Sequence, residues 1–86
     1  METRVAVMSI IVEQPDTVRE LNELLHGYSE YIIGRMGIPY KAKNISIISI
    51  AIDAPQNTIS ALAGSIGNLK GLSVKTAFSS VVTHGE

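Results

Sequence analysis

The residues best suited to binding chemistry are Arg35 and two nearby glycines, Gly34 and Gly37. A guanidinium group holds several N–H donors in a fixed plane, so it can bind a carboxylate or phosphate through parallel hydrogen bonds. Glycine inside a strand gives up side-chain packing and is typical of places where a ligand or another backbone comes close. We therefore predict a binding role for Gly34, Arg35 and Gly37. The alternative is that Arg35 is an edge-strand charge that prevents unwanted sheet pairing.

A second candidate segment is the polar turn at residues 14–17, before the first predicted helix. The free amides and positive dipole end of a helix N-terminus attract anions, so Gln14, Asp16 and Thr17 are also candidate ligand-binding residues. Asp16 and the nearby Glu13 add negative charge, which disfavours an anionic ligand at this turn. The alternative is that Asp16 or Thr17 caps the helix, and Thr17 with Glu20 matches a capping box.

Side chains suited to catalysis or metal binding are scarce. The chain has no cysteine and two histidines, His26 and His84, which excludes disulfides, thiolate metal sites and iron–sulfur clusters. The serines fall mostly inside predicted strands without a neighbouring base, and no pair of carboxylates stands beside a nucleophile. We interpret the two histidines as solvated or capping groups. The sequence therefore predicts no enzyme, no metal site and no cofactor.

Length and charge restrict the class of protein further. The 86 residues predict a single domain over residues 1–86, with an ordered core at about residues 4–82. A core this small provides only marginal stability to a single chain, and we therefore expect a partner subunit to stabilise it. The net charge is −1 and the basic residues are dispersed, which predicts no direct contact with nucleic acid. The apolar run at residues 5–12 is too short to span a membrane, so we expect no membrane contact and a soluble cytoplasmic protein.

The pattern of apolar residues predicts the element order strand, helix, strand, strand, helix, strand. The predicted strands cover residues 4–12, 31–38, 45–52 and 72–79. The first helix is predicted to make about four turns from residue 17, the second to begin at residue 55 and end near residues 67–71, and residues 83–86 to be loose. This βαββαβ order predicts an α+β ferredoxin-like sandwich: a four-stranded antiparallel sheet with two helices on one face.

That topology predicts an uncovered apolar surface. The first and third strands are central in it, and here both carry apolar residues on both of their faces. Two helices cover one face only, so we expect another subunit to cover the other face. Dimer and tetramer both remain open. Subunits can either extend the sheet side by side or stack their sheet faces, and apolar residues on both faces favour stacking.

Motifs along nearly the whole chain resemble a known family. They are Leu-Asn-Glu-Leu-Leu-His at 21–26, Gly-Arg-Met-Gly-Ile-Pro at 34–39, Asn-Thr-Ile-Ser-Ala-Leu at 57–62, and the stretch at 64–76. In these motifs the chain resembles the regulators of the iron-only hydrogenase system. That family is grouped with ACT-like regulatory domains and is similar to the ligand-binding C-terminal half of the nickel-responsive repressor. The resemblance implies an ACT-like fold with a binding and regulatory role.

The resemblance to the repressor does not extend to its nickel site. The positions that match the nickel ligands are Tyr28, Gly37, Pro39 and Ile45, which offer neither imidazole nor thiolate. The repressor also has a DNA-binding segment before its first sandwich strand, whereas this chain begins at that strand. If the chain regulates transcription, we therefore expect it to act through a protein partner.

Together these observations predict a homo-oligomeric regulatory module that senses a small molecule at a subunit interface. ACT domains typically bind amino acids at such interfaces through the turn after the first strand, which here is the glycine-free turn at residues 14–17. One alternative is a ligand-free adaptor that dimerises and binds another protein. The other is a small enzyme or metal-binding protein.

Overall fold

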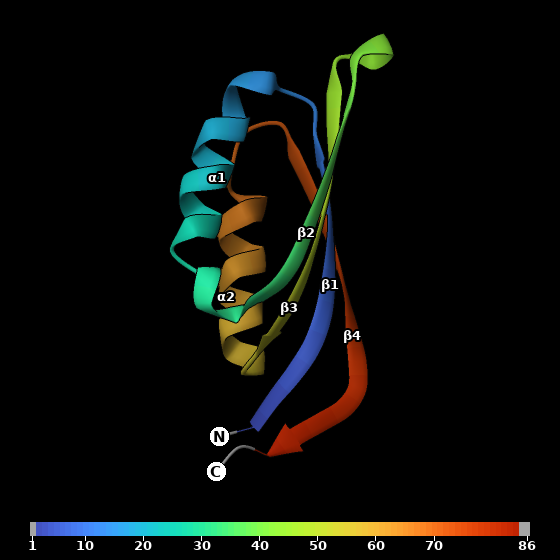
Figure 1. Cartoon of the computed structure of the whole chain (residues 1–86). Coiled ribbons are helices and arrows are strands. Elements are labelled where there is room, and N and C mark those ends of the chain that lie inside the picture. Colours follow the sequence, from blue (N-terminus) through green and yellow to red (C-terminus); the bar gives the residue numbers. More distant parts are fainter. Residues whose placement is uncertain (1, 85–86) are drawn as a thin grey trace.

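The computed structural model describes residues 2–84, which form a four-stranded sheet with two α-helices on one face (Figure 1). The elements are β1 (Glu2–Val12), α1 (Val18–His26), β2 (Ile32–Tyr40), β3 (Ile45–Ala54), α2 (Gln56–Gly67) and β4 (Leu72–His84). The sheet order is β2-β3-β1-β4, and every neighbouring pair is antiparallel. The predicted α+β ferredoxin-like fold is confirmed, with the first and third strands at its centre.

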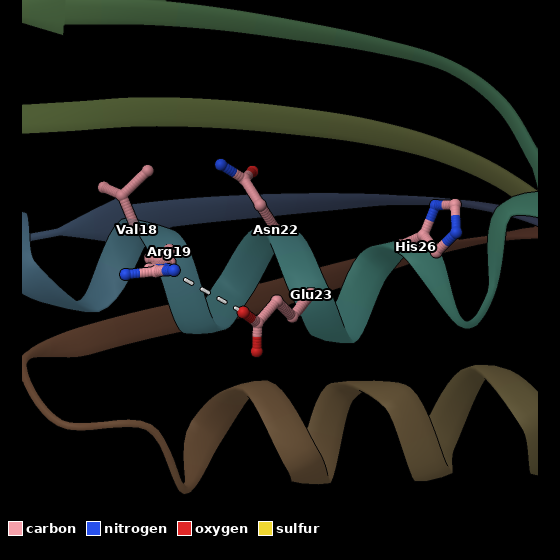
Figure 2. Close-up of a pocket in the computed structure, with 5 residues that line it drawn as sticks. All are labelled: Val18, Arg19, Asn22, Glu23 and His26. Atoms are coloured by element: carbon pink, nitrogen blue, oxygen red, sulfur yellow. Dashed lines mark ion pairs between the residues drawn. The ribbon is translucent and has the colours of Figure 1, made fainter.

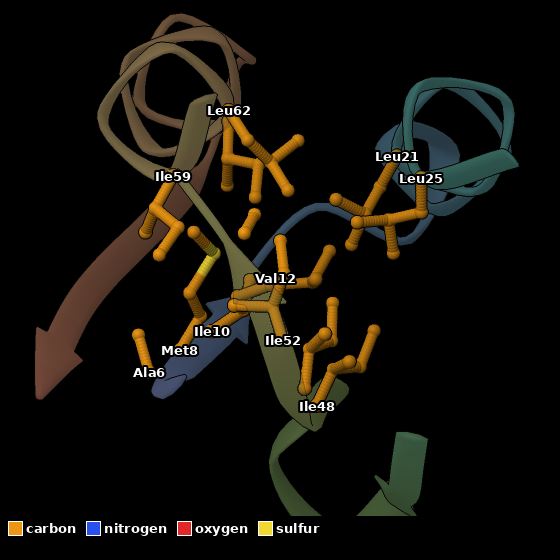
Figure 3. Close-up of a cluster of buried hydrophobic side chains, with 13 residues drawn as sticks. Ala6, Met8, Ile10, Val12, Leu21, Leu25, Ile48, Ile52, Ile59 and Leu62 are labelled. Carbon is orange, nitrogen blue, oxygen red and sulfur yellow. The ribbon is translucent and has the colours of Figure 1, made fainter. Parts of the chain in front are cut away.

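The hydrophobic core lies between the helices and the sheet face that they cover (Figure 3). Side chains alternate between the two faces of a strand, and the even-numbered residues of β1 and β3 point toward the helices. The helices contribute the apolar stripes that their spacing predicts. The buried hydrophobic residues are Ala6, Met8, Ile10, Val12, Leu21, Leu25, Ile48, Ile50, Ile52, Ala54, Ile59, Leu62 and Ile66.

The first helix is shorter than the predicted four turns. A 3₁₀ turn at Pro15–Thr17 precedes α1, which has 9 residues, and a second 3₁₀ turn follows at Ser29–Tyr31. The helical apolar spacing continues to Tyr28, and this explains the longer prediction, but the α-helix ends at His26 before Gly27. Within residues 2–84, no helix has the length and apolar character needed to cross a membrane.

Strand β4 extends beyond its predicted end at residue 79. It runs to His84 because it continues to pair with β1, up to the partners Glu2 and His84. The prediction that residues 83–86 are loose is therefore wrong for residues 83 and 84, while residues 85 and 86 lie outside the described part. The pairing shifts between Arg4 and Ala6, and β4 bends near its C-terminal end (Figure 1).

Candidate functional site

A groove between α1 and β2 brings Arg35 together with polar side chains of the first helix region. Its volume is about 270 Å³, and it is lined by Asn22, Leu25, His26, Ser29, Ile32 and Arg35. Nη2 of Arg35 donates a hydrogen bond to Oδ1 of Asn22. Because a guanidinium carries five N–H donors, this bond orients the group and leaves further donors for a ligand. We call this site the Arg35 groove.

The helical repeat explains why these polar side chains share one side of the helix. His26 lies four residues after Asn22, and residues at that spacing are neighbours on a helix surface. Figure 2 shows Asn22 and His26 projecting toward the strands, while Arg19 and Glu23 point away from them. Nε of Arg19 and Oε1 of Glu23 are 3.9 Å apart, so this arginine already has an acidic neighbour on the exposed side of α1.

The direction of Arg35 depends on an irregularity in β2. The pairing of β2 with β3 shifts between Ile32 and Gly34, so Ile33 is an extra residue in the edge strand. Beyond it, the β3 partners of Arg35 and Gly37 are buried isoleucines that face the helices. The partner of Gly34 is an alanine on the opposite face. The structure therefore puts Arg35 and Gly37 on the helix side of β2 and Gly34 on the reverse side.

Neither glycine of this strand is required by crowding within the chain. A Cβ atom added at Gly34 would meet nothing within 4 Å, and one at Gly37 would only touch a side-chain carbon of Ile48 at 4.0 Å. The backbone of β2 thus stays uncovered at both positions. This openness is compatible with the approach of a ligand or another chain that the sequence suggested for them.

The charge of the Arg35 groove is unbalanced within the described chain. Among residues 2–84, the ion pairs are Arg19 with Glu23 and His84 with Glu2, so Arg35 takes part in neither. No carboxylate lines its groove. An oriented guanidinium without an acidic neighbour is suited to hold an incoming carboxylate or phosphate.

The turn that contains Gln14, Asp16 and Thr17 makes contacts of its own elsewhere. Oγ1 of Thr17 is buried and donates a 2.8 Å hydrogen bond to the carbonyl oxygen of Lys70. Neither the 3₁₀ turn nor α1 has a side-chain cap, so the proposed capping by Asp16 or Thr17 is wrong. The structure uses the hydroxyl of Thr17 to tie this turn to the loop after α2.

The side chain of Gln14 also faces that loop. Gly71 has φ +74°, and a Cβ atom there would lie 2.6 Å from Cγ of Gln14. Asp16 remains exposed. Pro15, next to these candidates, lies beside Pro39 and Tyr40 at the end of β2, whereas Arg35 lies four residues earlier, roughly 13 Å along the strand. Within one chain, the structure therefore keeps the two predicted groups of site residues apart, and a site that joins them across a subunit interface stays a prediction.

Sequence reasoning missed the helix side of the groove. The polar residues on that side are spaced as on a helix, four and three residues apart: Asn22, His26 and Ser29. The sequence contains no signal that these residues lie next to Arg35. Elsewhere, no cluster of three or more metal-ligating side chains exists within residues 2–84.

Comparison with known structures identifies a similar fold. TM1266, an uncharacterized protein from Thermotoga maritima, matches with a TM-score of 0.85 and 36% sequence identity, over 88% of this chain and 96% of that chain. A formyltetrahydrofolate deformylase from Pseudomonas putida KT2440 matches with a TM-score of 0.62 and 9% identity. That match covers 85% of this chain and 28% of the deformylase chain, and it shows the shared fold alone.

The family was identified from the sequence. No protein with curated annotation gives a significant match to the chain. The profile of one family matches residues 4–76, which include both helices and the whole of the Arg35 groove. The resemblance inferred from the sequence motifs is thereby confirmed: the chain belongs to the TM1266-like family, described provisionally as iron-only hydrogenase system regulators.

Proposed function

We propose that this chain is a non-catalytic, homo-oligomeric regulatory module of an iron-only hydrogenase system that senses a small anionic ligand in the Arg35 groove. The observation that carries the proposal is the guanidinium of Arg35, which is oriented by Asn22 and has no carboxylate in its groove. Such a group binds a carboxylate or phosphate through charge-assisted hydrogen bonds. The family description supports a regulatory role.

Strand β2 offers a route from the ligand to the subunit interface. Arg35 lies on the helix side of this strand, while the next residue, Met36, is 61% exposed and lies on the sheet face without helices, which we call the open face. A ligand that draws Arg35 into a new position also displaces its neighbour, because the two side chains share one backbone segment. Binding in the groove is thus coupled to the surface that another subunit covers. The response passes to a protein partner of the hydrogenase system.

A ligand screen by thermal denaturation tests the sensing role. Amino acids, other carboxylates, nucleotides and inorganic phosphate are added separately to the purified protein. A ligand that binds only the native state stabilises it by about 2.7 kcal/mol at a hundredfold excess over Kd, which raises the Tm of a small domain by several degrees. We expect a carboxylate or phosphate compound to give such a shift.

The matched variants are Arg35→Ala and Arg19→Ala. Both remove an exposed arginine whose side chain contacts a residue of α1, Asn22 for Arg35 and Glu23 for Arg19, but only Arg35→Ala empties the groove of its arginine. The ligand-induced shift should disappear in Arg35→Ala and persist in Arg19→Ala. A screen without any hit, or a shift that survives in Arg35→Ala, would refute sensing in this groove.

A ligand-free adaptor is the second candidate function. It is favoured by the exposed apolar side chains on the open sheet face, which offer a protein partner a surface even without a ligand. A flat ligand screen together with stable binding of a hydrogenase-system protein would support the adaptor over the sensor.

A further inference from the structure

The sheet face that carries no helix is an apolar surface. Seven large apolar residues on it are between 41% and 61% exposed, and they come from three neighbouring strands: Val5, Val7, Ile11, Met36, Ile38, Tyr40 and Ile47. Figure 1 shows both helices on the other side of the sheet. A folded chain that stays alone in water rarely exposes such a contiguous patch, so the face is expected to be covered.

The register of the strands gives this open face a relief. Ile38, Ile47 and Ile11 are cross-strand neighbours and form a row of large side chains. The next row along the strands, on the same face, has Ser49 and Ser9 at its centre and the larger Met36 and Lys75 at its ends. The row after it consists of Gly34, Ala51, Val7 and Ala77, so small side chains occupy most of the centre of the face beside the isoleucine ridge.

We propose that a second copy of this chain covers the open face, so that two sheets stack face to face. Sheets that stack in this way interdigitate their side chains at a separation of about 10 Å. A two-fold axis places the ridge of each copy over the small residues of the other, and such self-complementarity is what an isologous interface needs. This inference rests on the homo-oligomer of the proposed function and specifies its interface.

The charges on the open face also suit a second copy. Within the paired region the face carries Lys75 on β4 and Asp53 on β3, while its centre holds the neutral Ser9 and Ser49. The face therefore has no net charge with which to select a strongly charged partner. Two copies bring one cation and one anion each, so their stacking leaves no excess charge at the interface.

The sheet edges are less suited to joining subunits. The edge strand β2 is interrupted at Ile33 and contains Pro39, which has no backbone N–H to donate. The other edge strand, β4, has its own irregularity between Phe78 and Val82. Bulges and prolines are common means of preventing edge pairing. The two edges thus favour stacking of faces over extension of the sheet.

The area of the open face is large enough for a stable pair. Four strands spaced about 4.8 Å apart, each with about nine paired residues rising about 3.3 Å, give a footprint of roughly 550 Å². Two such footprints exceed the roughly 1,000 Å² expected of a specific interface. No larger partner is needed to bury the apolar residues.

The first experiment measures the solution mass of the full chain by light scattering. We expect at least two copies of the 9.2 kDa chain for the wild type, and 9.2 kDa for Ile47→Lys, in which a cation replaces a 42% exposed residue of the ridge. The control, Ala61→Lys, places the same charge on an exposed residue of α2, on the helix side of the sheet, and should keep the wild-type mass. Circular dichroism verifies that both variants are folded.

The second experiment uses the absence of cysteine from the chain. Ser9→Cys places one thiol at the centre of the open face, and Ser60→Cys places one on the exposed side of α2. A flexible bismaleimide longer than the roughly 10 Å between stacked sheets should cross-link Ser9→Cys into dimers and leave Ser60→Cys monomeric on a denaturing gel.

The outcomes separate this inference from the proposed function. A monomeric wild type refutes the stacked pair but leaves ligand binding through Arg35 to its own test. An oligomer that persists in Ile47→Lys and does not cross-link at position 9 shows that copies meet elsewhere. A monomeric Ile47→Lys with cross-linking at position 9 supports the stacked pair even if the ligand screen is flat.

Discussion

At the scale of single residues, Thr17 shows how a polar group is used inside this small core. It is 4% exposed, and its hydroxyl donates a 2.8 Å hydrogen bond to the carbonyl of Lys70. Thr17→Val keeps the shape and removes the donor, so we expect a loss of about 1 kcal/mol of unfolding free energy. Thermal denaturation should register this as a fall in Tm of about 4–8 °C. The control is Thr83→Val, at an exposed position, which should change the free energy of unfolding by less than about 0.5 kcal/mol. An equal effect in both variants would contradict a role for the hydrogen bond between Thr17 and Lys70.

Only one half of the candidate site, the Arg35 segment of β2, can be recognised from the sequence. Arg35 is recognisable because a cation between glycines in a strand is unusual. The other polar residues of the groove, Asn22, His26 and Ser29, cannot be recognised in this way. They meet Arg35 only because the extra residue Ile33 decides to which face of the sheet Arg35 points. A shift of one residue in pairing sends every later side chain to the opposite face, and a single sequence does not show where such shifts occur.

At the scale of elements, two of the glycines in α2 and the loop after it have opposite roles. Gly71 has φ +74°, and a Cβ atom there would lie 2.6 Å from Cγ of Gln14, so Gly71→Ala should cost about 1–3 kcal/mol. Gly64 lies in the helix with nothing within 4 Å of a Cβ position, so Gly64→Ala should stabilise the protein by about 0.5 kcal/mol through helix propensity. Urea titrations of the two variants measure both changes, and a stabilising Gly71→Ala would show that the loop does not constrain this position.

The elements themselves are largely predictable because their apolar residues repeat at the spacing of strands and helices. The order, the sheet type and the central position of β1 and β3 follow from that repeat. Ends are less predictable, since they depend on partners distant in sequence. β4 reaches His84 because β1 still offers Glu2 to pair with, and α1 stops at His26 although Tyr28 continues its apolar stripe.

At the scale of the whole molecule, folding and assembly are expected to be one process. The chain has 86 residues and its core is confined to one side of the sheet. A domain of this size buries only about 60–65% of the surface of its unfolded chain. The open face is apolar surface that remains exposed after the monomer folds, and assembly can bury it.

If the stacked pair separates on unfolding, the Tm depends on protein concentration by mass action. A hundredfold dilution costs the pair about 2.7 kcal/mol of apparent stability, which should lower the Tm by several degrees. In Ile47→Lys, whose charge opposes stacking, we expect a lower Tm that no longer changes with concentration, whereas Ala61→Lys on α2 should show the concentration dependence of the wild type. Scanning calorimetry over that range of concentrations makes the comparison. A wild-type Tm that stays constant on dilution has two explanations: the native protein is a monomer, or the two chains stay associated during unfolding. The mass of the native protein distinguishes them, and a monomeric mass refutes the stacked pair.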